Sequence, residues 1–425
     1  MARLIRVFEH EKLTSSSRCS KGELVGTKVI NKLIQYNDAH KNIYFEAIHK
    51  GVKFKNYVGV IQVGHTTIEI LPKADKRSSE NEKAEWHSIL LKMLKKCKRI
   101  KVDSVSEAAL RKRYNSLLDL YFEEFLREVN SLLNQGLVKK YRKNSGNVLA
   151  LKGQINFSRN IQHNLVHQER FYTNHQVYDH QHLIHQIILK ALRILKVISY
   201  NSFLQDSIER IIAKFPEVKE VEIGKHHFDR IVLNRKTTKY REALKIAKMI
   251  ILNYSPDIKG GAENMLALLF DMNKLWEEYI YRMLSRLQNE HLKVSFQNKD
   301  NFWEKKVIKP DIVISQTFSD PEKKPQTLVI DTKWKIIDPD RPGDDDLKQM
   351  YVYNMYWNSQ KSILLYPSSN PPKTTFGKFH KGREEDNLCK LGFVKVNVGK
   401  ELDLDIGKNV LSLLKKANSI EISPK

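Results

Sequence analysis

The chain has 425 residues, and its 73 Lys and Arg residues exceed its 49 Asp and Glu residues, which gives a net charge of +24 at pH 7. A hydrophobic content of 41%, with 17 Phe and 17 Tyr, excludes an intrinsically disordered chain, and the length suggests about three domains. The large positive excess favours a polyanionic partner, most simply nucleic acid.

The cysteines and the apolar segments indicate the compartment. Cys19, Cys97 and Cys389 are far apart and odd in number, so they form neither a disulfide framework nor a zinc pattern. The N-terminus lacks the apolar run of a signal peptide, and no stretch approaches the roughly 18 apolar residues of a membrane helix. We therefore expect a soluble, cytoplasmic protein with no membrane partner.

Residues 1–80 are expected to form a β-rich domain that serves as a binding module. Gly64 and His65 are expected to form a hairpin turn between two of its strands. The strand candidates are Leu4–Phe8, Tyr44–Phe54, Val58–Val63 and Thr67–Leu71.

Residues 81–255 are expected to be mainly helical. An apolar stripe from Trp86 to Leu94 predicts one helix, and further helices are expected over 117–133, 180–198 and 240–252. Short strand-like pieces are expected around Gly153 and over 228–234. Two basic runs, 92–101 and 139–143, either contact phosphates or form solvated faces, and a turn is expected at 145–147 after the second. The histidines of this region lack the spacing of metal ligands, so they are read as structural or surface residues.

A linker at Ser255–Gly261 is the best domain boundary, and residues 262–425 are expected to form a C-terminal α/β domain. Met265–Leu287 is predicted to be one long amphipathic helix. At 100° per residue, Glu277 lies at the edge of its apolar stripe and Glu278 lies on the opposite, solvent side. Glu277 then either reaches a site on the neighbouring sheet or makes a surface salt bridge.

The most informative stretch of the sequence is 309–353. Pro310 and Asp311 open a short apolar run, and a second apolar run, Leu328–Ile330, delivers Asp331 and Lys333 at its end. Alternate residues of a strand share a face, so Asp331 and Lys333 should point the same way and Thr332 the other way. With residues 317–326 as a hairpin loop, two carboxylates and a lysine converge at the open end of a two-stranded ribbon.

This set of residues suits phosphodiester hydrolysis. Asp311 and Asp331 can hold Mg²⁺, which acidifies a bound water and neutralises charge on the phosphate. Lys333 can orient or help deprotonate that water and stabilise the transition state. The residues resemble the core of the PD-(D/E)xK nuclease superfamily. The alternative is an edge strand with a surface salt bridge.

A helix is expected to follow this ribbon. Asp344, Asp345 and Asp346 are well placed to cap its start, and Gln349 and Tyr353 share one face at the i,i+4 spacing. A Q-x-x-x-Y pattern after D-x-K resembles the RecB-like branch of the superfamily. The elements expected beyond it are strands at 362–366 and 391–398, a polar loop at 367–387 and a helix at 404–417.

Three further segments resemble the McrC family, the nuclease subunits of McrBC-type, 5-methylcytosine-specific (type IV) restriction systems. They are L-K-G-Q-I at 151–155, I-V-L-N-R at 231–235 and L-F-D-M-N-K-L-W-E-E-Y-I at 269–280. Trp276 stands where phenylalanine is commoner in the family, which is a mild change.

The resemblance implies a multidomain α+β protein whose C-terminal domain is restriction-endonuclease-like and binds Mg²⁺. It assigns catalysis to Asp311, Asp331 and Lys333, with the two aspartates as metal ligands. It gives accessory roles to Glu277, Gln349 and Tyr353.

The family also implies the partners. The chain has no G-x-x-x-x-G-K-[ST] motif, so it is not expected to be its own NTPase. The resemblance supplies a separate McrB-like AAA+ GTPase hexamer, contacted and stimulated through residues 1 to about 250, and double-stranded DNA as substrate. The alternatives are a non-catalytic adaptor that binds the motor and DNA, and a stand-alone nuclease.

Overall fold

The computed structural model describes residues 3–19, 22–73, 80–99, 116–255, 264–318, 320, 322, 325–338, 341–368, 371–380, 387–395 and 402–415. The chain divides into two compact units. One contains residues 1–3, 61–67 and 106–268, and the other contains 4–60, 68–105 and 269–425. The expected linker lies outside the described residues from Pro256 onward. None of the described helices is both long and apolar enough to cross a membrane.

The first unit is built on four helices whose buried faces are mostly apolar, although Asp119, Glu124 and His185 are also buried there. Helices were predicted for most of this region. Ser116 caps the first of them through a hydrogen bond from the Asp119 backbone N–H, and the branched chains of Ile187, Ile188 and Leu192 are completely buried. The helices are α4 (Leu117–Asn134), α6 (Leu183–Ile198), α7 (Ser202–Lys214) and α9 (Arg241–Asn253).

The prediction of a strand over 228–234 is wrong. Residues Lys225–Asp229 form a short helix, α8, and the chain beyond it has no regular structure before Thr238. The local hydrogen bonds explain this, because the His227 ring accepts from the Gly224 N–H and satisfies the start of the helix within the segment itself.

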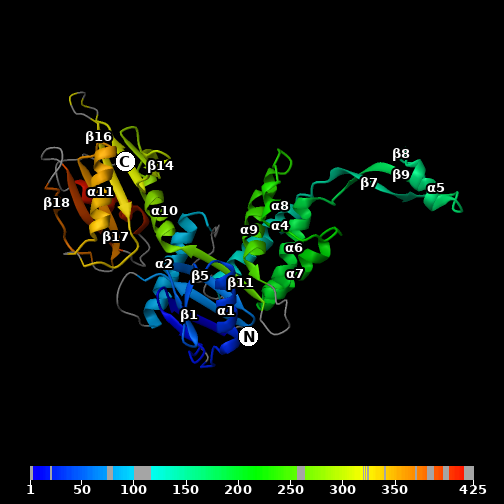
Figure 1. Cartoon of the computed structure of the whole chain (residues 1–425), viewed down its shortest axis with the longest axis horizontal. Helices are drawn as coiled ribbons and strands as arrows, with labels where there is room; N and C mark the ends of the chain where they lie inside the picture. The colour runs from blue at the N-terminus through cyan, green and yellow to red at the C-terminus, as the bar shows by residue number, and fades with distance from the viewer. Residues whose placement is uncertain are drawn as a thin grey trace. The chain divides into compact units, whose positions relative to one another are not determined.

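An arm extends away from these helices (Figure 1). It consists of β7 (Lys140–Val148) and β9 (Phe171–Asp179), with β8 (Gln154–Ile155) and α5 (Phe157–Asn164) at its far end. The turn expected at 145–147 is wrong, because Gly146 pairs with Thr173 in an unbroken antiparallel register. Gly153 is required where the chain returns, since its φ is +65° and a Cβ there would lie 2.4 Å from the Asn174 carbonyl oxygen.

The strands expected in the N-terminal region are present, except that the candidate over Tyr44–Phe54 is two antiparallel strands joined by a turn at 49–50. A five-stranded sheet has the order β1-β6-β5-β11-β10, and a three-stranded sheet has the order β2-β4-β3. Helix α1 (Thr27–Ala39) was not predicted, and α2 (Glu80–Lys96) contains the predicted stripe of Trp86 and Leu94. The strands are β1 (Arg3–Phe8), β2 (Lys12–Thr14), β3 (Phe45–Ile48), β4 (Gly51–Phe54), β5 (Tyr57–Val63), β6 (Thr66–Leu71), β10 (Tyr254–Ser255) and β11 (Met265–Asp271).

The single helix predicted for Met265–Leu287 is wrong. Its first part is the strand β11, and the helix α10 covers only Met272–Ser285. The physical reason is that 265–268 are all buried between neighbouring strands, so their continuous apolar run needs no helical period. Asp271 then starts the helix, because its carboxylate accepts the Asn273 N–H at 3.0 Å.

The C-terminal sheet has six strands in the order β12-β15-β16-β17-β19-β18. Strand β15 pairs antiparallel with both β12 and β16. Strand β17 pairs parallel with both β16 and β19. These strands are β12 (Leu292–Phe296), β15 (Ile312–Gln316), β16 (Gln326–Thr332), β17 (Lys361–Ser368), β18 (Phe376–Lys378) and β19 (Leu388–Lys395). The β15–β16 hairpin and the strands β17 and β19 were predicted, but β12 and β18 were not. Residues 396–398 of the last predicted strand lie outside the described residues.

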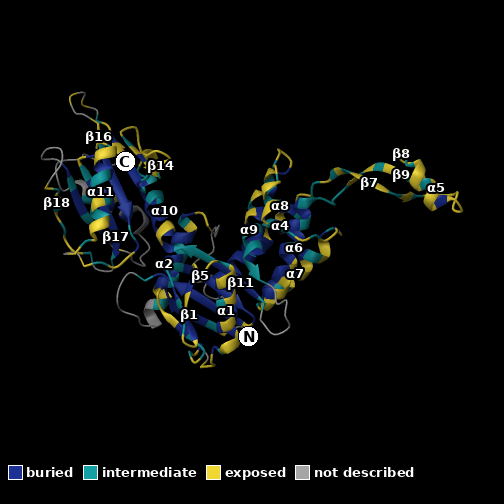
Figure 2. Ribbon diagram, viewed as in Figure 1, coloured by how far each residue is buried: buried dark blue, intermediate teal, exposed yellow. Residues whose placement is uncertain are grey.

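Helices cover this sheet. In α11 (Asp344–Tyr356), Met350 and Tyr353 pack on Val329 and Leu364. On the other side of β19 lies α12 (Leu402–Lys415), where a Cβ at Gly392 would be 3.3 Å from Leu413 Cδ1, and α12 also packs on α10. Figure 2 shows the strands buried beneath these helices. The end of β16, where Asp331 lies, is therefore at the edge of a well-packed core.

Candidate active site

Asp311 and Asp331 lie on neighbouring strands at one end of the C-terminal sheet. Ile312 pairs with Ile330 in the antiparallel register of β15 and β16, so the two acids flank this pair. The Thr332 N–H and hydroxyl both donate to Asp311 Oδ2, at 2.7 and 2.9 Å. Thr332 thus lines the site, although strand alternation predicted that it points away. These bonds fix the Asp311 carboxylate across the two strands.

Lys333 lies directly beside Asp331. Its Nζ is 2.8 Å from Asp331 Oδ2 and 3.6 Å from Asp346 Oδ1, and it donates to Gln349 Oε1 at 3.1 Å. Burial lowers the pKa of Lys333, but the Asp331 and Asp346 carboxylates outweigh it and raise this pKa above its usual range. Lys333 is therefore a fixed positive charge in the site. Asp346, expected only to start a helix, holds it from a second side.

Glu277 reaches the same site from α10. It is 9% exposed, and its Oε1 accepts a hydrogen bond from Gln297 Nε2 at 2.6 Å. Burial, followed by the nearby Asp311 carboxylate, raises the pKa of Glu277 to about 7. Burial and the same neighbour raise the pKa of Asp331 to about 7. These shifts follow from placing several carboxyl groups close together in a site with little exposure to solvent.

Glu278, expected on the solvent side of the helix, is instead largely covered. Its side chain is 15% exposed, and its carboxylate pairs with Arg99 at 2.8 Å and with Arg282 at 3.2 Å. The Glu277–Glu278 pair therefore faces two different polar environments, and only Glu277 faces the site.

Gln349 and Tyr353 share one face of α11, as their spacing predicts. Gln349 Nε2 donates to the Tyr353 hydroxyl at 2.6 Å, and that hydroxyl donates to the Lys309 carbonyl oxygen at 2.9 Å. Gly343, and not an aspartate, is the N-cap residue of α11, and the aspartates occupy its first turn. The helix thus fixes Lys333 through Gln349 and the start of β15 through Tyr353.

These groups line a pocket of about 320 Å³. Sequence reasoning missed Asn273 and Lys309, although Lys309 stands immediately before the Pro310–Asp311 pair that was recognised. The lining residues are Asn273, Glu277, Lys309, Asp311, Asp331, Thr332, Lys333, Gln349 and Tyr353.

The donor set suits a hard cation. Carboxylate oxygens are the ligands that Mg²⁺ prefers, and the repulsion that raises the pKa of Asp331 would be relieved by a divalent charge. Among the described residues no group of three or more His, Cys, Asp or Glu forms a ready-made metal cage. A metal here would therefore rest on Asp311 and Asp331 with waters completing its shell, which is the usual arrangement for Mg²⁺.

A buried contact links the end of β16 to the N-terminal sheet. Trp334 Nε1 donates to Glu9 Oε1 at 2.5 Å, and the Lys73 N–H donates to the same oxygen at 2.8 Å. The Trp334 ring packs edge-on against Trp276 and Trp86, with centroids 5.2 and 6.4 Å away. Burial raises the pKa of Glu9 to about 7. The residue after Lys333 is thus held by residues from far earlier in the chain, which no local pattern signals.

Comparison with known proteins gives a consistent picture. Residues 52–367 match the family described as McrBC 5-methylcytosine restriction system component. The chain is also similar to the type IV methyl-directed restriction enzyme EcoKMcrBC of Escherichia coli (strain K12), with 22% identity over 308 residues. That match covers 68% of this chain and 85% of the relative.

Two solved structures from Thermococcus gammatolerans share the fold. A chain of the refined half-complex from the tetradecameric assembly of McrB AAA+ hexamers with bound McrC matches with a TM-score of 0.69 and 18% identity. It covers 96% of this chain and 100% of that one. A chain of the McrBC complex determined by cryo-EM matches with a TM-score of 0.50 and 20% identity, over 67% of this chain and 88% of that one.

Proposed function

We propose a function for this chain from one premise: it belongs to the family of McrBC 5-methylcytosine restriction system components. The chain is the Mg²⁺-dependent endonuclease subunit of a modification-dependent restriction complex, with a PD-(D/E)xK domain at its C-terminal end. It hydrolyses phosphodiester bonds of double-stranded DNA when a partner AAA+ GTPase activates it.

One observation carries this proposal. Asp311, Asp331 and Lys333 come together at one end of β15 and β16, and they line a pocket that Glu277 also enters. A surface salt bridge on an edge strand, the alternative reading of the D-x-K motif, does not fit an Asp331 side chain that is 2% exposed within the sheet. Buried carboxyl groups with raised pKa values in a pocket are typical of catalytic sites.

The residues divide the chemical work between them. Mg²⁺, when bound, would acidify a water and neutralise charge that develops on the phosphate. Asp311 and Asp331 would hold it, and the Lys333 ammonium group would stabilise negative charge on the phosphate oxygens. Gln349 orients Lys333, and Glu277, with its raised pKa, can hold or release a proton near neutral pH.

The family and an exposed surface of the arm both support an AAA+ GTPase as the partner. A related assembly contains McrB AAA+ hexamers with bound McrC, and we place the corresponding contacts of this chain within residues 1 to about 250. The arm supplies a candidate contact surface, because large apolar side chains at its far end are exposed, and exposed apolar clusters mark interaction sites. They are Leu149, Leu151, Phe157, Ile161, Leu165 and Val166.

The test is Mg²⁺-dependent cleavage of methylated and unmethylated plasmid DNA with the partner GTPase and GTP. Wild type should cut the methylated plasmid and Asp331→Ala should cut neither. Equal cutting by both would show that the active site is elsewhere. If neither protein cuts but wild type still stimulates the partner's GTPase, the chain is an adaptor. Cutting by wild type without any partner would make it a stand-alone nuclease.

A further inference from the structure

A small hairpin stands directly before the candidate site in the chain. Among the described strands, β13 (Asp300–Trp303) and β14 (Lys306–Ile308) pair only with each other, and they connect β12 to Asp311. Trp303 pairs with Lys306, and Glu304, with a φ of +47°, forms the turn together with Lys305. No part of the mechanism uses this element.

The hairpin exposes large apolar side chains. Trp303 is 62% exposed, Val307 55% and Phe302 50%. The register shifts between Asn301 and Trp303, and bulges of this kind re-aim side chains next to functional sites. Aromatic rings that are exposed to water add little to the stability of an isolated two-stranded hairpin. These rings therefore form a candidate contact surface for a ligand.

Contacts at its base hold the hairpin against the pocket. The Gln297 N–H donates to the Asp311 carbonyl oxygen at 2.8 Å, while the Gln297 side chain bonds Glu277. At the other end, the Lys309 carbonyl oxygen accepts from Tyr353. On one side, the Phe302 ring lies 5.7 Å from that of Tyr356 on α11. A ligand on the hairpin would thus be held beside Asp311.

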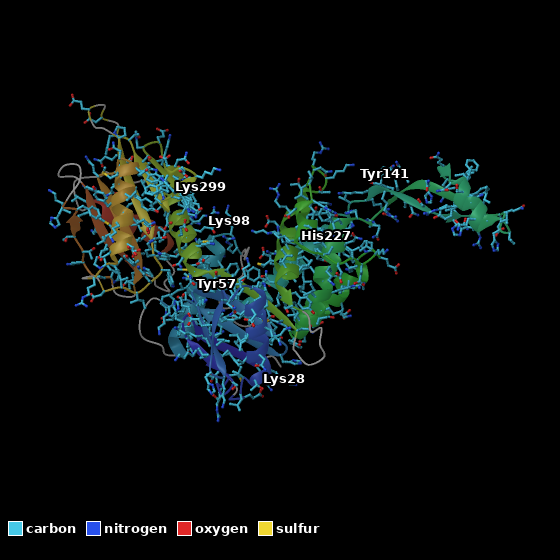
Figure 3. The ribbon with its side chains drawn as sticks, in the orientation of Figure 1. Lys28, Tyr57, Lys98, Tyr141, His227 and Lys299 are labelled. Atoms are coloured by element: carbon cyan, nitrogen blue, oxygen red, sulfur yellow. The ribbon has the colours of Figure 1, made fainter. Side chains whose placement is uncertain are left out.

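Charge identifies the ligand. Between Gln297 and Lys309 the chain carries four lysines against the two acids Asp300 and Glu304. Lysines around an exposed aromatic ring suit phosphates that flank a stacked base, whereas a second copy of this chain, itself strongly positive, would be repelled. Figure 3 labels Lys299 where the hairpin begins. The lysines are Lys299, Lys305, Lys306 and Lys309.

We propose that the β13–β14 hairpin grips the DNA duplex beside the scissile phosphate. Trp303 wedges against the bases and partly unstacks them, and Lys299, Lys305 and Lys306 contact neighbouring phosphates. This inference rests on the proposed function, since it takes DNA as the substrate of the adjacent site. It assigns the hairpin the positioning of the duplex and leaves hydrolysis to the pocket.

The first test measures binding of the full chain to a fluorescein-labelled duplex without divalent cations, across a salt series. Trp303→Ala should weaken binding roughly 5- to 100-fold at every salt concentration, because it removes a stacking contact. The Lys305→Ala/Lys306→Ala double variant should reduce the slope of log affinity against log salt by about 2, because it removes two phosphate contacts.

Matched controls separate the hairpin from general surface effects. Phe203→Ala removes another half-exposed aromatic ring, and Lys236→Ala removes another exposed charge, each in the helical unit. Both should bind DNA as wild type does, and Trp303→Phe should restore most of the affinity that Trp303→Ala loses. If Trp303→Ala matches Phe203→Ala, or if Trp303→Ala alters self-association in sedimentation instead of DNA binding, the inference is overturned.

The second test detects unstacking directly. A duplex carrying 2-aminopurine at successive positions should brighten at one or two of them when wild type or Asp331→Ala binds, and should stay dark with Trp303→Ala. Brightening with Trp303→Ala would overturn the wedge. If Trp303 passes both tests while wild type never cleaves DNA, the proposed nuclease fails and the DNA contact stands.

Discussion

The candidate site and the arm break the usual rule of polar outside and apolar inside in opposite directions. In the site, carboxyl groups are buried, with Asp331 only 2% exposed, and each is held by defined partners. In the arm, Phe157 is 72% and Val166 85% exposed. Both arrangements cost stability, the first through desolvation and the second through wetted apolar surface. The first suits chemistry on a small charged group, and the second suits contact with a large surface.

The largest effect is expected from Lys333→Gln. This change keeps a side chain that can bond Gln349 but removes the positive charge beside Asp331. We expect single-turnover cleavage to fall by about 10² to 10⁴, the usual range for losing such a group. DNA affinity, measured in parallel, should change little. A variant that keeps a tenth of the wild-type rate would contradict a catalytic role for this charge.

The next largest effect is a difference in the free energy of unfolding between variants of the candidate site and variants of the arm. Ile330→Ala empties a fully buried position between Val329 and Asp331, so urea unfolding should show a loss of about 2–5 kcal/mol. Phe157→Ala removes a mostly exposed ring from the arm, and its unfolding free energy should stay within about 0.5 kcal/mol of wild type. Binding to the AAA+ partner should weaken for Phe157→Ala instead. Comparable unfolding losses for both variants would show that the arm's apolar residues serve folding.

Glu9→Gln should change the pH dependence of stability. The folded-state pKa of Glu9 is raised from 4.5 to about 7, so its protonated form favours folding and its contribution is complete below pH 4.5. As pH rises from 4.5 to about 7, about 3 kcal/mol should be lost in wild type. Glutamine can still accept the Trp334 hydrogen bond, so the variant should lack this loss. Parallel stability curves for the two proteins between pH 4.5 and 7.5 would contradict the raised pKa.

Tyr353→Phe should give the smallest effect. The hydroxyl joins Gln349 to the Lys309 carbonyl oxygen, so its loss frees Gln349 and loosens the orientation of Lys333. A hydrogen bond of this kind contributes about 1 kcal/mol, which corresponds to roughly a fivefold slower cleavage step. KM for DNA should be unchanged, and a rise in KM without a slower step would instead place Tyr353 in substrate binding.

Much of the site could be predicted because its signals are local. Asp331 and Lys333 follow a short apolar strand, Asp311 opens its neighbour, and Gln349 and Tyr353 share a helical face at a fixed spacing. Each relation spans few residues, so strand alternation and helix period place the side chains without tertiary information.

The remainder depends on contacts that the sequence does not encode locally. The run at 265–271 is apolar throughout, and a buried strand cannot be told from a buried helix by such a pattern. Trp334 is held by Glu9, which is 325 residues away in the chain. The arm was missed because Gly146 and Asn147, typical of turns, sit inside a strand whose partner lies beyond α5.

The contact between Glu9 and Trp334 also limits how this protein can be divided or recombined. A fragment that begins after residue 262 would carry the strands of the candidate site but lose Glu9, Lys73 and the α2 residue Trp86. The Trp334 N–H would then have no acceptor, and the neighbouring rings would face water. Chimeras between relatives should therefore transfer residues 4–60 and 68–96 together with the C-terminal domain, because these segments supply the contacts around Trp334.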